Sequence, residues 1–164
     1  MSKTTENLKA AFAGESQANR KYLAYAAKAD QEGLPQIAKL FRAAAAAETI
    51  HAHAHLRLLK GVGSTAENLK DAISGESYEF QTMYPEMIKD AQAEDERAAE
   101  RYFGFANAAE EVHANLYTEA AEKMGELESG DYYVCSVCGH IHPGKPEDKC
   151  PICGAAPKAY FKVD

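Results

Sequence analysis

The feature that most constrains the fold of this chain is a Glu-x-x-His motif that occurs twice, at residues 48–51 and again at residues 110–113. A Glu and a His three residues apart lie on one face of an α-helix, so their side chains can bind one metal ion together. One such pair arises by chance in many helical proteins. The second pair is informative because the surrounding sequence repeats as well.

The repeat is clearest upstream of the two motifs. Residues 6–16 recur at 67–77 with eight of eleven positions identical, so Glu15 corresponds to Glu76. The offset is 61 residues there and 62 at the Glu-x-x-His motifs. One Glu from each of two helices, with Glu-x-x-His from each of two others, is the ligand set of ferritin-like two-metal bundles. The predicted metal ligands of this set are Glu15, Glu48, His51, Glu76, Glu110 and His113.

Apolar residues spaced three and four apart predict four long helices. The helices are expected from about Thr4 to Glu32, from Pro35 to the glycines at 61 and 63, from the Ser64 capping box to about Gln92, and from about Asp95 to Glu126. Pro85 predicts a kink in the third helix. The predicted ligands lie within the apolar stripes, where unpaired carboxylates would cost several kcal/mol each. The alternative, that these glutamates are solvated, requires the same register error in all four helices.

One further glutamate breaks the symmetry of the repeat. Glu79 lies three residues after Glu76 and on the same helix face, whereas its counterpart in the first half is Ala18. An isolated glutamate at such a position is more often a surface residue. Because Glu79 stands beside a predicted ligand, we interpret it as a metal ligand too.

The C-terminal residues carry a different pattern. Cys135-x-x-Cys138 and Cys150-x-x-Cys153 are each followed by glycine, and two such pairs can present four thiolates tetrahedrally to zinc or iron. Spacing alone does not separate a zinc ribbon from a mononuclear iron site, and on the residues alone we place zinc slightly ahead. The neighbouring histidines at 140 and 142 are not expected to be ligands, since four cysteines complete the tetrahedron. We therefore predict two domains, residues 1–130 and 131–164, the second too small to fold dependably without its metal.

Composition limits the partners of the chain. The formal net charge is -7, which argues against nucleic acid or an anionic membrane as a partner. No apolar run approaches transmembrane length, and the first residues lack the apolar core of a signal peptide. Cysteines paired in this way without a secretory signal indicate a metal site and not disulfides, so we expect a cytoplasmic protein.

The two modules in this order resemble rubrerythrin, and the resemblance covers the whole chain. The motifs that carry it are Gly14-Glu15-Ser16, Gly75-Glu76-Ser77-Tyr78-Glu79, the two Glu-x-x-His motifs and the two cysteine pairs. The resemblance implies an all-α ferritin-like four-helix bundle followed by a small rubredoxin-like domain. It also implies that Glu79 joins the six predicted residues as a di-iron ligand, with Glu48 and Glu110 bridging the irons. Tyr22 and Tyr84 match family tyrosines that hydrogen-bond near the site.

The same resemblance implies iron in the four-cysteine site, with zinc still possible, and a peroxidase activity. Hydrogen peroxide would be reduced to water with electrons from an external donor, a reductase or a rubredoxin-like carrier. On oxidation one iron of the family exchanges a histidine for the extra glutamate, which here would be His51 and Glu79. The alternative function is a ferritin-like ferroxidase or iron-handling protein with a structural zinc knuckle.

The connection between the two halves predicts how the chain assembles. Between Gly61 and Ser64 about four free residues reach only about 14 Å, whereas each helix is about 40 Å long. A ferritin-like bundle needs one connection that crosses the whole bundle. We therefore predict a domain-swapped homodimer, in which one chain supplies the first-half ligands and its partner supplies the second-half ligands. A plain up-down-up-down bundle is the alternative.

Overall fold

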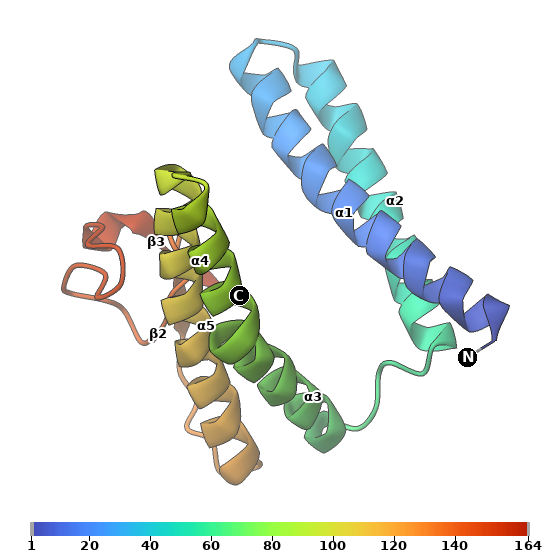
Figure 1. Ribbon diagram of the computed structural model, residues 1–164. Coiled ribbons are helices and arrows are strands. Elements are labelled where there is room, and N and C mark those ends of the chain that lie inside the picture. The colour runs from blue at the N-terminus through green and yellow to red at the C-terminus, as the bar shows by residue number, and fades with distance from the viewer. Residues whose placement is uncertain (1, 164) are drawn as a thin grey trace. The chain divides into compact units, whose positions relative to one another are not determined.

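The computed structural model describes residues 2–163, and the chain packs as two compact units that divide between Gly63 and Ser64 (Figure 1). The N-terminal unit consists of α1 (Lys3–Gln31) and α2 (Pro35–Leu58). The C-terminal unit contains α3 (Thr65–Tyr78), a π-helix (Glu79–Met83), α4 (Tyr84–Ala93), α5 (Arg97–Glu122) and the cysteine-rich module. The predicted domain boundary after residue 130 separates the helices from the cysteine-rich module, whereas this division separates two helical halves. The boundary after residue 130 therefore stays a prediction.

Local chemistry explains where the helices begin and end. The Ser2 side chain accepts a hydrogen bond from the Thr5 N–H and caps α1. Gly33 follows that helix with φ +73°, a left-handed conformation that favours glycine. Before α3, Ser64 and Glu67 form the capping box that the sequence predicts. The four helical segments expected from the sequence are thus confirmed, with ends that differ by a few residues.

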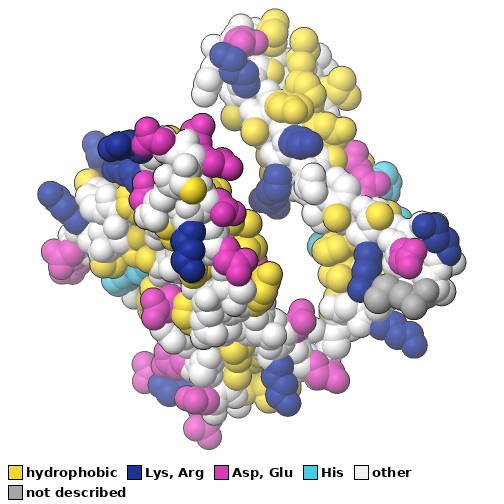
Figure 2. All heavy atoms as spheres, in the orientation of Figure 1, with side chains coloured by type: hydrophobic (Ala, Val, Ile, Leu, Met, Phe, Trp, Pro, Cys, Tyr) yellow, Lys and Arg dark blue, Asp and Glu magenta, His cyan; other side chains and the backbone are white. Residues whose placement is uncertain are grey.

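The N-terminal unit buries small side chains and exposes large ones. Among the described residues of α1 and α2, the buried ones are alanines and one asparagine: Asn19, Ala26, Ala29, Ala38, Ala45 and Ala52. Large apolar side chains remain exposed, including Ile37 at 46% and Leu40 at 69%. Figure 2 shows hydrophobic side chains gathered over the upper part of this hairpin. Two helices that meet through alanines approach closely, but they leave most of their apolar surface uncovered.

The C-terminal unit departs from the predicted third helix in one place. Instead of a simple kink at Pro85, the helix passes through the π-helix, where the Tyr84 N–H bonds to the Glu79 carbonyl five residues earlier. Pro85 follows directly in the first turn of α4. Because proline has no N–H and crowds the carbonyl four residues before it, regular α-helical bonding is interrupted at this point.

The π-helix also accounts for the change of offset in the internal repeat. Glu15 and Glu76 are 61 residues apart, whereas Tyr22 and Tyr84 are 62 apart. The additional residue of the second half therefore lies between positions 77 and 83, the segment that contains the π-helix. A π-turn accommodates one extra residue and lets the α-helix continue beyond it.

The cysteine-rich module is built on a three-stranded antiparallel sheet in the order β2-β1-β3. Its strands are β1 (Tyr132–Cys135), β2 (Ile141–Pro143) and β3 (Tyr160–Val163), and a 3-10 helix (Pro157–Ala159) precedes β3. The register pairs Cys135 with Tyr160 across β1 and β3. Strands this short gain little from their ladder bonds, which fits a module held together by a metal.

Within residues 2–163, no helix combines the length and the apolar character that crossing a membrane requires.

Candidate metal centres

Three predicted ligands come together in the N-terminal unit. Glu15 lies on α1 and Glu48 and His51 lie on α2, and one ligand atom of each lies within 4.8 Å of the others. The His51 Nδ1 is 3.0 Å from the Glu48 Oε2 and 3.9 Å from the Glu15 Oε1. Two carboxylates and one imidazole thus converge from two helices, as the sequence predicts.

The C-terminal unit repeats this arrangement. Glu76 on α3 and Glu110 and His113 on α5 also place ligand atoms within 4.8 Å of one another. The His113 Nδ1 is 2.6 Å from the Glu110 Oε2 and 3.9 Å from the Glu76 Oε2. Each unit therefore holds one group of three potential ligands, and the two groups share the same chemistry.

Electrostatics show why the second group suits a cation. Burial, followed by the hydrogen bond and charge of Glu110, raises the pKa of Glu76 to about 7. The hydrogen bond from His113 instead lowers the pKa of Glu110. The Glu110 carboxylate thus opposes the ionisation of its partly buried neighbour Glu76, and a bound cation would stabilise both carboxylates in the charged form.

The two histidines differ in how they are held. The His113 Nε2 lies 3.1 Å from the carbonyl oxygen of Gly139. A carbonyl only accepts hydrogen bonds, so the Nε2–H donates to Gly139, while the Nδ1–H donates to the Glu110 carboxylate. Loss of the Nδ1 proton would leave a lone pair that faces the carboxylates and could bind a metal. The side chain of His113 is 15% exposed in the chain, whereas that of His51 is 56% exposed. No motif in the sequence indicates this contact, because Gly139 belongs to the cysteine-rich module.

Two of the other predicted site residues, Glu79 and Tyr84, interact electrostatically with the C-terminal group. Glu79 begins the π-helix and falls outside the groups of three, but burial and then the Glu110 charge raise its pKa. Burial and then Glu110 likewise raise the pKa of Tyr84. Tyr22 packs against Phe41, with ring centroids 6.2 Å apart, as Tyr84 packs against an aromatic ring of α5. Glu79 and Tyr84 therefore share the electrostatic environment of Glu110.

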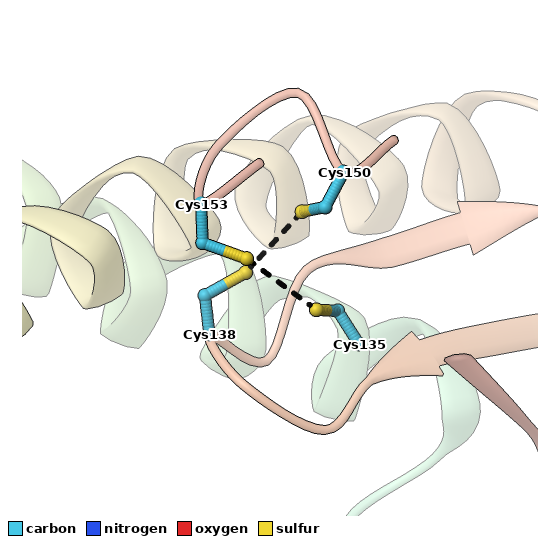
Figure 3. Close-up of side chains that lie close together, drawn as sticks. All are labelled: Cys135, Cys138, Cys150 and Cys153. Atoms are coloured by element: carbon cyan, nitrogen blue, oxygen red, sulfur yellow. Dashed lines mark hydrogen bonds between the residues drawn. The ribbon is translucent and has the colours of Figure 1, made fainter. Parts of the chain in front are cut away.

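The four cysteines point towards one another from two loops (Figure 3). The Cys135 and Cys153 sulfurs are 3.7 Å apart, and those of Cys138 and Cys150 are 3.5 Å apart. All four are free thiols, and these separations are far longer than a disulfide bond of about 2 Å. Four sulfurs around one ion at about 2.3 Å would be separated by about 3.8 Å, so the observed spacing fits a tetrahedral metal site.

The two loops form matching knuckles, residues 135–140 and 150–155. The N–H of Gly139 donates to the Cys135 carbonyl and that of Gly154 donates to the Cys150 carbonyl, each at 2.9 Å. Both glycines have positive φ, +80° and +75°, which explains why glycine follows each second cysteine. This turn aims further backbone N–H groups at the sulfurs, including those of Ile152 and Cys153 at Cys150.

One thiol is prepared for ionisation in this setting. Burial opposes the charge of Cys150, but backbone N–H groups and the Tyr160 hydroxyl donate hydrogen bonds that lower its pKa to about 6. The Tyr160 hydroxyl also lies 2.7 Å from the His140 Nδ1. The cysteine spacing predicts that His140 is not a ligand and indicates no role for the Tyr160 hydroxyl. The strand register that brings Tyr160 to the cysteines could not be read from cysteine spacing.

The donor sets fit the metals that the sequence suggests. Mixed carboxylate and imidazole groups suit iron, and four thiolates suit iron or zinc. The two groups of three and the four cysteines are the metal-binding clusters found among the described residues. Each of these clusters contains residues that the sequence predicts as ligands.

Comparisons with known proteins agree with this chemistry. Residues 6–121 match the rubrerythrin family model, and residues 133–162 match the model for the rubredoxin-like domain of rubrerythrin. Nigerythrin of Nitratidesulfovibrio vulgaris is 40% identical over 164 residues, covering 92% of this chain and 81% of that protein. Rubrerythrin-2 of Clostridium acetobutylicum is 35% identical over 168 residues, covering 92% and 91%.

Solved structures extend the likeness to three dimensions. The partially reduced state of nigerythrin superposes with a TM-score of 0.60 at 37% identity, covering 99% of this chain and 88% of that one. The fully reduced, all-ferrous state of nigerythrin gives the same TM-score and identity. Nigerythrin therefore binds iron on a fold like this one. The chain belongs to the rubrerythrin family and has its two modules, a ferritin-like di-iron module and a rubredoxin-like module with a four-cysteine site.

Proposed function

We propose that this protein is a non-haem di-iron peroxidase that reduces hydrogen peroxide to water, with electrons that enter through iron held by the four cysteines. The rubrerythrin family is a family of oxidoreductases, and the carboxylate and histidine groups supply the ligands for such chemistry. The observation that carries the proposal is the hydrogen bond between His113 and Gly139. It joins a candidate di-iron ligand directly to the turn that follows Cys138.

The proposed di-iron ligands divide between the two units of the chain. They are Glu15, Glu48 and His51 from the N-terminal unit, and Glu76, Glu79, Glu110 and His113 from the C-terminal unit. When bound, two ferrous ions supply the two electrons that cleavage of an O–O bond requires. The carboxylates offset the positive charge of the metals, and the Gly139 carbonyl keeps the His113 Nδ1 directed at them.

We further propose that His51 and Glu79 alternate as ligands when the oxidation state changes. The Gly139 carbonyl orients His113, and no comparable contact holds the Nε2 of His51 in the part of the chain that the structure describes. Glu79 already lies close enough to Glu110 for the charge of Glu110 to raise its pKa. A hard carboxylate suits the ferric ion and the softer imidazole suits the ferrous ion, which gives the exchange its direction.

The four-cysteine site acts as the entry point for electrons in this proposal. Its outer partner is an external one-electron donor, such as a reductase or a rubredoxin-like carrier. The thiols must stay reduced to bind metal, which fits a location in the cytoplasm. Storage of iron would need no such entry point, so the module itself favours the peroxidase over a ferritin-like ferroxidase.

Replacement of Cys150 by serine tests this role. In the full-length Cys150→Ser variant, we expect steady-state peroxide reduction with an external reductant to fall to background. A di-iron centre that has been reduced chemically should still be oxidised once by peroxide, because its ligands are untouched. Stopped-flow and steady-state assays on the same preparation, with iron determined per chain, separate the two effects.

A neighbouring exposed residue provides the control. Lys149→Ser changes the same loop without removing a thiol and should keep wild-type turnover. Unchanged steady-state turnover in Cys150→Ser with no iron in the knuckle would mean that electrons do not enter there. That outcome would favour the alternative, a ferroxidase or iron-handling protein whose knuckle holds structural zinc.

We also propose that the active form is a domain-swapped homodimer, with a site that combines the N-terminal group of one chain and the C-terminal group of the other. Only six residues, 59–64, separate α2 from α3. They span at most about 25 Å, whereas a crossing connection must match the α2 length of about 36 Å.

The incomplete packing of each unit supports assembly. The Asn19 Oδ1 and His55 Nδ1 are buried without a hydrogen-bond partner in the N-terminal unit, as is the Asn107 Oδ1 in the C-terminal unit. Buried polar atoms are rarely left unpaired in a finished fold. Together with the exposed apolar face of α1 and α2, they favour units that are completed by further contacts.

A further inference from the structure

A tyrosine hydroxyl links the two knuckles of the cysteine-rich module. Tyr160 packs against the buried cluster of Cys135, Cys138 and Cys150. Its hydroxyl lies 2.7 Å from the His140 Nδ1. Burial and then the interaction of this hydroxyl with the Cys150 sulfur raise the pKa of Tyr160, and the same interaction helps to lower the pKa of the thiol against the effect of burial. His140 belongs to the first knuckle and Cys150 to the second, so Tyr160 connects them from β3.

The direction of these hydrogen bonds follows from the chemistry of the groups. A metal-bound thiolate only accepts hydrogen bonds, so Tyr160 donates its single hydroxyl proton to the Cys150 sulfur. The hydroxyl oxygen is then an acceptor for the His140 Nδ1–H. His140 is buried, with 6% of its surface exposed, which fixes the imidazole against the hydroxyl. The histidine thereby holds the tyrosine in the orientation that serves the sulfur.

Comparison of the two knuckles shows that this network is additional to their shared backbone. In both knuckles the first cysteine donates its backbone N–H to the carbonyl five residues later. Cys135 donates to His140, and Cys150 donates to Ala155. His140 and Ala155 therefore occupy matched positions. The alanine offers no side-chain donor, so the hydroxyl network is a feature of one knuckle and is not required by the turn.

We propose that the Tyr160 hydroxyl, held in place by His140, raises the reduction potential of iron bound by the four cysteines. Reduction adds one electron from a one-electron carrier and moves no proton, so the negative charge shared by the four sulfurs increases. A hydroxyl donor stabilises the more negative, ferrous state more than the ferric state. Tyr160 is thus a positioning residue for electron entry, and the inference requires iron in this site but not peroxidase activity.

The test uses full-length, iron-loaded protein and the variant Tyr160→Phe, which removes only the hydroxyl. Spectroelectrochemical titration of the thiolate-to-iron absorption gives the midpoint potential. At a fixed solution potential we expect the ratio of reduced to oxidised iron to fall about tenfold, a midpoint lower by about 59 mV for one electron. Tyr133→Phe is the matched control: it removes a hydroxyl from β1, outside the group packed on the cysteines, and should leave the potential unchanged.

A second substitution tests the role of His140. His140→Phe should lower the potential by less than Tyr160→Phe, because the hydroxyl remains but is no longer held. Added to Tyr160→Phe it should cause no further fall, since the two residues act through one hydrogen bond. The proposal is overturned by an unchanged potential in Tyr160→Phe with a normal absorption spectrum, or by equal effects of His140→Phe in both backgrounds. If Tyr160→Phe failed to bind iron while Tyr133→Phe still bound it, the Tyr160 hydroxyl would be needed for the structure of the site. That result would also overturn the proposal.

Discussion

At position 79 the second half of the chain carries a carboxylate where the first half has alanine. Glu79 begins the π-helix and lies in the field of Glu110, yet it is not in the three-ligand group of its unit. A carboxylate beside a metal site but not committed to it can bind in one oxidation state and leave in the other. Its removal should therefore affect turnover more than metal binding.

We expect Glu79→Ala to keep two irons in the di-iron site and to slow peroxide reduction by about 10–100-fold, the range found when groups that support a metal site are removed. Iron per chain and steady-state rates are the measurements. Glu86→Ala, an exposed glutamate in the following helix, is the control. If Glu79→Ala had the same kinetics as Glu86→Ala, Glu79 would be a surface glutamate and not a metal ligand.

Residue by residue, the sequence predicted the groups that depend on one helix face and missed the contacts that depend on packing. Glu110 and His113 are three apart, so their proximity follows from helix geometry alone. The contact between His113 and Gly139 spans 26 residues and two kinds of structure, and nothing local encodes it. The same holds for Tyr160 and His140, which meet only because β3 pairs with β1.

At the level of elements, helix ends were predictable because capping is local. The Ser64 capping box and the Pro35 start were readable as short motifs. The π-helix was not, although the repeat offset contained the information that one residue had been added. Pro85 pointed to an irregularity, but a proline alone does not distinguish a kink from a π-turn.

Deletion of one residue from the π-helix tests its contribution. Removal of the exposed Thr82 should let α3 and α4 join as one α-helix, because it restores the spacing found in α1. We expect the free energy of unfolding to change by less than about 1 kcal/mol, and peroxide turnover to fall at least about tenfold as Glu79 loses its setting. Thr82→Ala, which keeps the chain length, should behave as wild type. Full activity in the deletion variant would show that the π-helix is not needed for turnover.

At the scale of the whole molecule, the prediction concerns which chains complete a site. Glu48→Ala damages only the N-terminal group and Glu110→Ala only the C-terminal group. In a swapped dimer formed from one chain of each kind, one of the two sites contains both intact groups. Co-refolding the two inactive variants should therefore restore di-iron sites to about a quarter of the wild-type number, since about half of the dimers are mixed.

A pair of variants damaged in the same unit supplies the control. Glu15→Ala mixed with Glu48→Ala should restore nothing, because every site then lacks an N-terminal ligand. Absorption of the di-iron centre and iron per chain report the outcome. If the mixture of Glu48→Ala and Glu110→Ala also stays inactive while dimers form, each chain builds its own site and the swap is wrong.

The division of the ligands between two units has a consequence for how the protein responds to its surroundings. If neither unit alone completes the site, metal occupancy and association of chains are thermodynamically linked. Each tightens the other by the same free energy, so iron slows dissociation of the dimer and dilution of the protein releases iron. The amount of protein that a cell makes would then help to set the fraction of it that carries metal, and iron starvation would act first on the least abundant pool.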